Sequence, residues 1–421
     1  MERARDVVIT GTGVVSPLGV GNEKYWAALA SRRSGVAQLT KEQGRNKAFQ
    51  FGAPLVDFDG KQFVTPRKAL KVMCLEIQAG YAAASLAMEH AGLAVGTVDP
   101  DRLGVVMGTN LYYCHPSALD SAFGGCIVDG EFDFDRWAGH AMSNVYPLWM
   151  LKYLPNMAAC QIGIAQDARA HNNTITLEEV SGLLAIVESA SVIERGWSDV
   201  MIAGGSGSRL SLTPMVYRGD VKVSHFEGEP EQASRPFDAR RRGLVNGEGA
   251  AAIILESRQH AEARGAEILA TVLGSGRSYG ASFEQAEGFQ AGIERSIAWA
   301  LKSAGVGPGE VGHVVAHGLG TLEDDPPEAK AIRAQLGDAP VTALKSYFGH
   351  LGAGSGVVEL VGSLLGRAHG EVPVTLNYEQ PDPECPINVI HEQPLRPTSS
   401  ISLALSQSAT GQAVALAIGG P

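Results

Sequence analysis

The chain has 421 residues, of which 45% are hydrophobic, and a formal net charge of −11 at pH 7. This acidic balance argues against a nucleic-acid partner, which requires a basic face, and no signal peptide or run of about 18 apolar residues points to a membrane. Five widely spaced cysteines without a CxxC pair indicate reduced thiols in a cytoplasmic protein, with no disulfide framework and no metal site.

Short apolar runs recur along the chain and mostly end at glycine or a polar turn, as buried parallel strands do. The first, Val7–Thr10, is expected to break at Gly11-Thr12-Gly13. The others are Leu103–Met107, Val200–Ala203, Ala250–Leu255, Ile268–Val272 and His313–Ala316. Helical periodicity predicts helices over Lys71–Ala91, Met157–Ala168, Gly182–Arg195, Gly288–Ala304 and Val357–Ala368. Strands that alternate with helices predict an α/β fold with a mixed sheet covered on both faces.

The alternating pattern starts again near residue 258, in the polar stretch Arg258–Gly265. We therefore predict two halves of similar order, residues 1–257 and 258–421. The first half carries an insertion at about 111–155 that is rich in aromatic residues. Because aromatic residues more often pack than bind, this insertion is predicted to be a packed cap or a subunit interface.

Seven further segments combine glycine, proline, histidine and acidic residues in a characteristic order. They are Val8–Gly19, Leu154–Ala159, Asp199–Gly205, Arg235–Asp238, Gly243–Ala250, Ala316–Gly318 and Lys345–His350. In this order they resemble the β-ketoacyl synthase family over nearly the whole chain. The resemblance implies a thiolase-like duplicated βαβαβαββ fold in five layers, α-β-α-β-α, that works as a dimer.

The segment Asn172–Gly182 resembles the nucleophile turn of that family, in which a strand runs into a buried helix N-terminus. At the position of the family's cysteine this chain has Glu179. A thiolate can take an acyl group from a thioester and hold it, whereas a carboxylate would form a far more labile anhydride. The resemblance therefore implies a relative of condensing enzymes that does not condense by the usual route.

His317 and His350 match the family's two active-site histidines. Two imidazoles aimed at the oxygen of a thioester enolate stabilise its charge by roughly several kcal/mol in a dry, preorganised site. Lys345 matches the family's buried lysine, and Glu328 matches the acid expected to pair with it, because burying an unpaired ammonium is costly. Asp325 is predicted to support the site together with Glu328.

The family's substrate-binding elements are only partly present. A glycine-rich loop near the C-terminus normally completes the oxyanion hole, and within Gln407–Ala413 only Gly411 matches it. Two threonines normally hold the phosphopantetheine arm of the acyl carrier protein; Leu319 replaces the first and Thr321 remains. Thr321 and Gly411 are thus the predicted substrate-binding residues. The carrier's phosphopantetheine arm is expected as the substrate carrier, with no permanently bound cofactor.

Two kinds of ketosynthase-like protein lack the cysteine. Chain-length factors pair with an active ketosynthase and shape a shared acyl tunnel at the dimer interface. As the alternative to a packed cap, the insertion at about 111–155 would line an acyl tunnel. Chain-initiating decarboxylases convert malonyl-carrier protein to acetyl-carrier protein. The altered C-terminal loop favours the first role, whereas the retained His317, His350 and Lys345 favour the second.

Charge favours the first role, because an ionised Glu179 would repel an incoming malonyl carboxylate. We therefore predict a non-condensing partner of chain-length-factor type in fatty acid or polyketide biosynthesis. The alternatives are malonyl-carrier-protein decarboxylation and a thioester reaction with Glu179 as general base. The predicted partners are the acyl carrier protein and, in a dimer, either a second copy or an intact ketosynthase.

Overall fold

A computed structural model describes residues 6–40, 50–114, 116–210, 213, 222–281 and 286–421. The N-terminal half has eight main elements. They are β1 (Val7–Ser16), α2 (Leu75–His90), β5 (Leu103–Thr109), α5 (Met157–Gln166), β8 (Asn172–Ile175), α6 (Ser181–Glu194), β9 (Val200–Ser208) and β10 (Glu248–Ser257). Their strands lie side by side as β1-β10-β9-β5-β8, with β9, β5 and β8 parallel and β10 antiparallel to both of its neighbours.

The C-terminal half repeats this arrangement. Its elements are β11 (Ala270–Tyr279), α9 (Ala286–Ala304), β12 (Val311–Val315), α10 (Asp325–Leu336), β13 (Pro340–Thr342), α12 (Ser355–His369), β15 (Ile401–Gln407) and β16 (Gln412–Gly419). The strands lie as β11-β16-β15-β12-β13, and the parallel and antiparallel pairs fall at the same places as in the first half. Both halves therefore have the order first-fifth-fourth-second-third, which confirms the duplicated βαβαβαββ fold.

Smaller elements complete the described part of the chain. The strands and helices are β2 (Gly19–Val20), α1 (Asn22–Ala30), β3 (Ala37–Gln38), β4 (Phe51–Gly52), α3 (Asp120–Gly124), β6 (Ile127–Val128), β7 (Glu131–Phe132), α4 (Trp137–Asn144), α8 (Arg258–Ala263), α11 (Lys345–Phe348) and β14 (Asn388–Val389). Short 3-10 turns lie at Gly60–Gln62, Arg67–Val72, Pro100–Arg102, Pro116–Ala118, Phe134–Arg136, Trp149–Tyr153, Glu178–Val180, Pro230–Gln232, Pro308–Glu310 and Gly352–Gly354.

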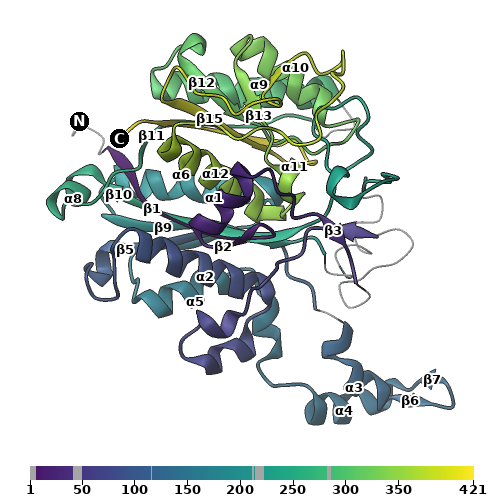
Figure 1. Cartoon of the computed structure of the whole chain (residues 1–421). Helices are drawn as coiled ribbons and strands as arrows, with labels where there is room; N and C mark the ends of the chain where they lie inside the picture. Colours follow the sequence, from purple (N-terminus) through teal and green to yellow (C-terminus); the bar gives the residue numbers. More distant parts are fainter. Residues whose placement is uncertain (1–5, 41–49, 115, 211–212, 214–221, 282–285) are drawn as a thin grey trace.

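The two halves stack into five layers (Figure 1). Helices α9 and α10 cover one side of the C-terminal strands, α2 and α5 cover the far side of the N-terminal strands, and α6 and α12 lie between the two sets of strands. The main hydrophobic core surrounds these central helices and includes Leu183, Ile186, Val357 and Leu360, each at most 1% exposed. The first strand joins the halves, because Val7–Ile9 of β1 also pairs with β11.

The predicted break in the first strand is wrong. β1 continues to Ser16, with an irregular register between Ile9 and Gly11. The glycines serve packing: a Cβ on Gly13 would lie 2.2 Å from the Ala83 carbonyl oxygen in α2. Helix α2 therefore rests directly on the backbone of the strand.

The insertion projects from the body. Residues 120–144, here called the arm, form α3, β6, β7 and α4 at a distance from the layers (Figure 1). Inside the arm Phe123 and Trp137 pack with ring centroids 4.9 Å apart, while Phe134 is 73% and Met142 86% exposed. The arm is thus held by its own small aromatic cluster and leaves large apolar side chains uncovered. Among the described residues, no helix has the length and apolar character needed to cross a membrane.

Candidate active site

The Glu179 turn lies where β8 runs toward the N-terminus of the central helix α6. Glu178 has a φ of +55°, a left-handed backbone conformation that residues other than glycine rarely adopt. Ser181 holds the turn: its hydroxyl accepts a hydrogen bond from the Leu177 N–H at 2.8 Å and donates to the Glu178 carbonyl at 2.6 Å. Glu179 is consequently presented, 7% exposed, at the start of the helix. The predicted passage from a strand into a buried helix N-terminus is confirmed.

One carboxylate oxygen of Glu179 has two nitrogen partners. Arg209 Nη1 and His350 Nε2 each lie 3.0 Å from Glu179 Oε1. Arg209 comes directly after β9, is 7% exposed, and donates through Nε to the Asn246 side chain at 3.3 Å. A buried carboxylate, a guanidinium and an imidazole thus form one cluster, which we call the Glu179 cluster.

The hydrogen bonds of His350 define its protonation. Its Nδ1 accepts from the Gly352 N–H at 3.3 Å and lies 3.1 Å from the Ser355 hydroxyl. The ring proton is therefore on Nε2, which donates to Glu179. Burial, and then the charge of Arg209, lower the pKa of His350 to about 3. The imidazole is neutral.

Glu179 is ionised. Burial alone would raise its pKa, but the hydrogen bond from His350, the positive charge of Arg209 and its own backbone N–H together hold the pKa well below its ordinary value. With His350 neutral, Arg209 is the cation that balances this carboxylate.

His350 is fixed to the neighbouring loop by its backbone. Its N–H donates to the Val245 carbonyl at 2.7 Å, and its carbonyl accepts from the Gly247 N–H at 3.0 Å. The preceding Gly349 has φ +66, and a Cβ there would lie 2.5 Å from the Val245 oxygen. Only glycine fits this close approach, so the local sequence determines where the imidazole stands.

His317 follows β12 and meets the lysine predicted from the sequence. Lys345 Nζ lies 2.6 Å from the His317 carbonyl oxygen, 2.7 Å from Glu359 Oε1 and 3.2 Å from His317 Nδ1. These contacts use all three ammonium protons. The expected pairing of Lys345 with Glu328 is wrong, because the direct acidic partner is Glu359 of α12. Burial raises the pKa of Glu359 to about 7, against the opposing charge of Lys345.

The other nitrogen of His317 is unused. Because Lys345 donates to Nδ1, the ring proton lies on Nε2, and this fully buried N–H has no hydrogen-bond partner among the described residues. Burial and then the charge of Lys345 hold the pKa of His317 well below its ordinary value. The ring centroids of His317 and His350 are 6.0 Å apart, and the two ring planes are nearly perpendicular. The imidazole N–H of His350 thus donates a hydrogen bond to Glu179, whereas that of His317 has no acceptor among the described residues.

Glu328 and Asp325 hold the backbone beyond His317. The Glu328 carboxylate accepts from the His317 and Gly318 N–H groups at 2.7 and 2.9 Å. Asp325 accepts from the N–H groups of Gly320 and Phe237 at 3.0 and 2.8 Å. Burial raises the pKa of Glu328 to about 7 and that of Asp325 to about 6. Both residues order the loop that carries the imidazole.

The two predicted substrate-binding residues are engaged within the protein. Thr321 is 1% exposed and donates to Asp324 at 2.6 Å. Gly411, with φ +100, closes the turn between β15 and β16, where its N–H donates to the Ser408 carbonyl at 2.9 Å. The C-terminal segment contacts the site through Ser406, whose hydroxyl donates to the Glu179 carbonyl at 3.0 Å.

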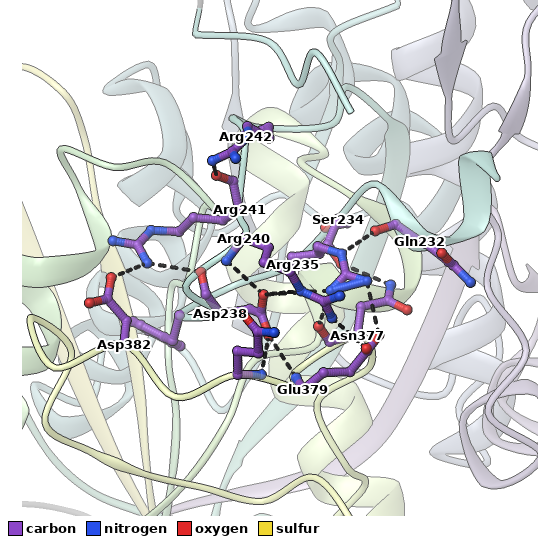
Figure 2. Close-up of polar contacts among 12 residues, drawn as sticks. Gln232, Ser234, Arg235, Asp238, Arg240, Arg241, Arg242, Asn377, Glu379 and Asp382 are labelled. Atoms are coloured by element: carbon purple, nitrogen blue, oxygen red, sulfur yellow. Dashed lines mark hydrogen bonds and ion pairs between the residues drawn. The ribbon is translucent and has the colours of Figure 1, made fainter. Parts of the chain in front are cut away.

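A second polar network supports the His317 loop from behind. Figure 2 shows Arg241 reaching Asp382 and the Asp238 backbone, at 2.6 and 2.9 Å. The same guanidinium donates through Nε to the Thr321 carbonyl at 2.8 Å. Asp238 in turn accepts from the Glu379 N–H at 2.7 Å. This network ties the Arg235–Asp238 motif to the loop around His317.

Two residues of the site, Arg209 and Glu359, are not predicted from the sequence. An available signal for Arg209 was its place at the carboxyl end of a buried strand, where parallel sheets gather functional side chains. Glu359 lies on the fully buried face of α12, and a carboxylate there requires a cationic partner. Lys345 was the one lysine already predicted to be buried.

The chain matches two protein-family models, which together cover most of its length. Residues 4–261 match the Beta-ketoacyl synthase, N-terminal domain, and residues 266–379 match the Beta-ketoacyl synthase, C-terminal domain. Among curated proteins, the chain is 32% identical to 3-oxoacyl-acyl-carrier-protein synthase 2 of Synechocystis sp., covering 99% of this chain and 98% of that protein.

Two solved structures share the fold over nearly the whole chain. A chain of the ishigamide ketosynthase/chain length factor superposes with a TM-score of 0.86 at 26% identity, covering 99% of this chain and 100% of the other. A chain of AntDE:AntF, a type II PKS acyl-carrier protein in complex with its ketosynthase, gives 0.85 at 27% identity with the same coverage. The matched domains, the strand order and the similarity to these relatives show that the protein belongs to the β-ketoacyl synthase family.

Proposed function

We propose that this chain is a non-condensing subunit of fatty acid or type II polyketide synthesis, in which Glu179 replaces the nucleophilic cysteine. It acts as a chain-length-factor-type partner of an active ketosynthase on chains bound to the acyl carrier protein. The observation that carries the proposal is the double contact of Glu179 Oε1 with Arg209 and His350. A carboxylate held in this way is not free to attack a thioester. If it did react, it would hold the acyl group only as a labile anhydride.

The same contacts disfavour the two alternatives. Decarboxylation requires imidazole N–H groups aimed at the developing enolate oxygen, and the His350 Nε2–H is already donated to Glu179. General-base catalysis requires a basic carboxylate, whereas the pKa of Glu179 lies well below its ordinary value. The Nε2–H of His317, which has no partner among the described residues, is a structural feature that favours residual decarboxylation.

A dimeric assembly is supported by the uncovered apolar surface. Eleven of the nineteen large hydrophobic side chains that are exposed among the described residues fall between residues 111 and 164. Such a concentration is typical of a protein–protein interface. The solved relatives suggest which partners to expect. The ishigamide structure contains a ketosynthase and a chain length factor, and the AntDE:AntF structure contains a ketosynthase with its acyl-carrier protein.

Two experiments test the proposal. In the first, malonyl-acyl-carrier protein is incubated with the purified chain, and its mass is followed by intact-protein mass spectrometry. No acetyl-carrier protein is expected; its formation, abolished by His317→Ala, would make the chain a decarboxylase and overturn the proposed role.

In the second, the chain is co-expressed with an intact ketosynthase that carries the nucleophilic cysteine, and the proteins are purified through a tag on one partner. A stoichiometric complex is expected, and Phe134→Glu with Met142→Glu in the arm should weaken it. Val95→Glu is the matched control, since Val95 is 59% exposed and lies outside the 111–164 segment. Recovery of the tagged chain alone would contradict the partner role.

A further inference from the structure

The Glu179 cluster contains the parts of a carboxylate-binding site, and the protein's own side chain occupies it. Arg209 Nη1 and His350 Nε2–H converge on one oxygen at 3.0 Å each. Arginine is the residue best suited to bind a carboxylate, and a neutral imidazole N–H adds a directional donor. All of these groups are at least nine-tenths buried, so water competes little for the contact.

A further donor at the same site is unused. His317 Nε2–H is fully buried and has no partner among the described residues, although its ring lies only 6.0 Å from that of His350. A buried N–H without an acceptor costs roughly 1–3 kcal/mol, so a built site would normally satisfy it. An anion larger or better placed than the Glu179 carboxylate is the kind of group to which this N–H would donate a hydrogen bond.

We infer that Arg209, His350 and His317 form a receptor for a small carboxylate, such as the terminal carboxylate of a malonyl-type acyl group, and that Glu179 keeps it closed as an internal substitute ligand. The inference rests on the proposed non-condensing role of this site and adds the ligand class and the means of autoinhibition. Removing the Glu179 carboxylate should therefore open the site to carboxylates from solution.

The test uses Glu179→Ala, because the atoms that this change removes have the composition of an acetate ion. Sodium acetate and the neutral isostere acetamide are titrated into the variant and into the wild type, at constant ionic strength. Binding is followed by thermal unfolding and by isothermal titration calorimetry. A saturable rise in Tm of about 1–2 °C with acetate is expected for the variant, with no response to acetamide and none in the wild type.

Two further variants locate the binding site. Glu179→Ala with Arg209→Met should lose the acetate response, because the guanidinium is gone. Glu179→Gln should also give none, because the amide still fills the space. A Glu179→Ala protein that responds equally to acetate and acetamide, or that keeps its response without Arg209, would overturn the inference. If Glu179→Ala does not fold, Glu179→Ser opens nearly the same volume and faces the same criteria.

A last arm distinguishes a free carboxylate from one carried on a thioester. The N-acetylcysteamine thioester of malonate is compared with that of butyrate, which has an apolar end in place of the carboxylate. Tighter binding of the malonyl compound to Glu179→Ala assigns the receptor to acyl groups, and binding of acetate alone limits it to free carboxylates. Failure of every arm would remove the receptor and leave the dimer experiment unaffected, so the two ideas fail separately.

Discussion

Lys345 and Glu359 form an ion pair at 2.7 Å with both side chains only 1% exposed. Lys345→Met would leave Glu359 and the His317 Nδ1 buried without their donor, at a cost of about 3–5 kcal/mol. Adding Glu359→Gln removes the stranded charge, so the double variant should be at least about 1 kcal/mol more stable than the sum of the single effects. Urea unfolding of all four proteins measures this coupling. Additivity within about 0.5 kcal/mol would mean that the two residues do not depend on each other.

Glu179→Gln should lower the free energy of unfolding by about 2–3 kcal/mol, because the buried Arg209 guanidinium loses the negative charge of its partner. Glu178→Gln is the matched control: the same chemical change, one residue earlier, on a side chain that accepts from Asn110 at 3.3 Å. It should cost less than about 1 kcal/mol. Equal losses for the two variants, measured by chemical denaturation at pH 7, would argue against the charged pair.

Acid should destabilise the protein through Glu256 of β10, which is fully buried. Burial opposes its ionisation, but hydrogen bonds from Arg264, His260 and Thr10 dominate and lower its pKa to about 2. The unfolded chain, with an ordinary pKa of 4.5, therefore binds this proton first as the pH falls. The stabilisation is complete above pH 4.5 and is lost between there and about pH 2, by about 3 kcal/mol.

The measurement is the free energy of unfolding as a function of pH. Glu256→Gln should remove this part of the slope. Glu262→Gln, on a side chain that is 61% exposed in the adjacent helix α8, should keep it. Parallel curves for the wild type and Glu256→Gln below pH 4.5 would refute the assignment.

Gly13→Ala should destabilise the fold by about 1–3 kcal/mol, because the new Cβ would lie 2.2 Å from a backbone oxygen of α2 and the helix would have to move. Gly139→Ala, the same substitution inside α4, meets nothing within 4 Å. There alanine should stabilise by up to about 1 kcal/mol through its higher helix propensity. Opposite signs in thermal unfolding are expected, and a neutral Gly13→Ala would contradict the close packing of α2.

The sequence predicts much of the fold because hydrophobic period and motif order are local properties. The helix starting at Met157 and the strand starting at Val200 begin where the patterns place them. The prediction of a break at Gly11 and Gly13 is wrong, because a glycine required by a neighbouring helix looks the same in the sequence as a glycine required by a turn. What distinguishes the two cases is the packing of Ala83 and Ala87, about 70 residues away in the chain.

The site was predicted unevenly for the same physical reason. His317, His350 and Lys345 lie in recognisable segments, so the sequence identifies them. Arg209 and Glu359 acquire their roles only when the ends of β9 and α12 meet groups distant in the chain. The partner of a buried charge depends on three-dimensional distance, and the nearest acid in the motif, Glu328, turned out to bind backbone N–H groups.

The central position of β1 in the sheet has a consequence for the folding of the chain during its synthesis on the ribosome. Apart from the two-residue strand β2, its partners are β10 and β11, which begin at Glu248 and Ala270. Strand β1 therefore lacks these two partners until the ribosome has made β10, which begins about 230 residues after the end of β1. At about 5–20 residues per second this is roughly 12–50 s, during which an apolar, β-prone segment is exposed. Nascent chains of this protein should thus depend on chaperone protection of β1 until β10 emerges.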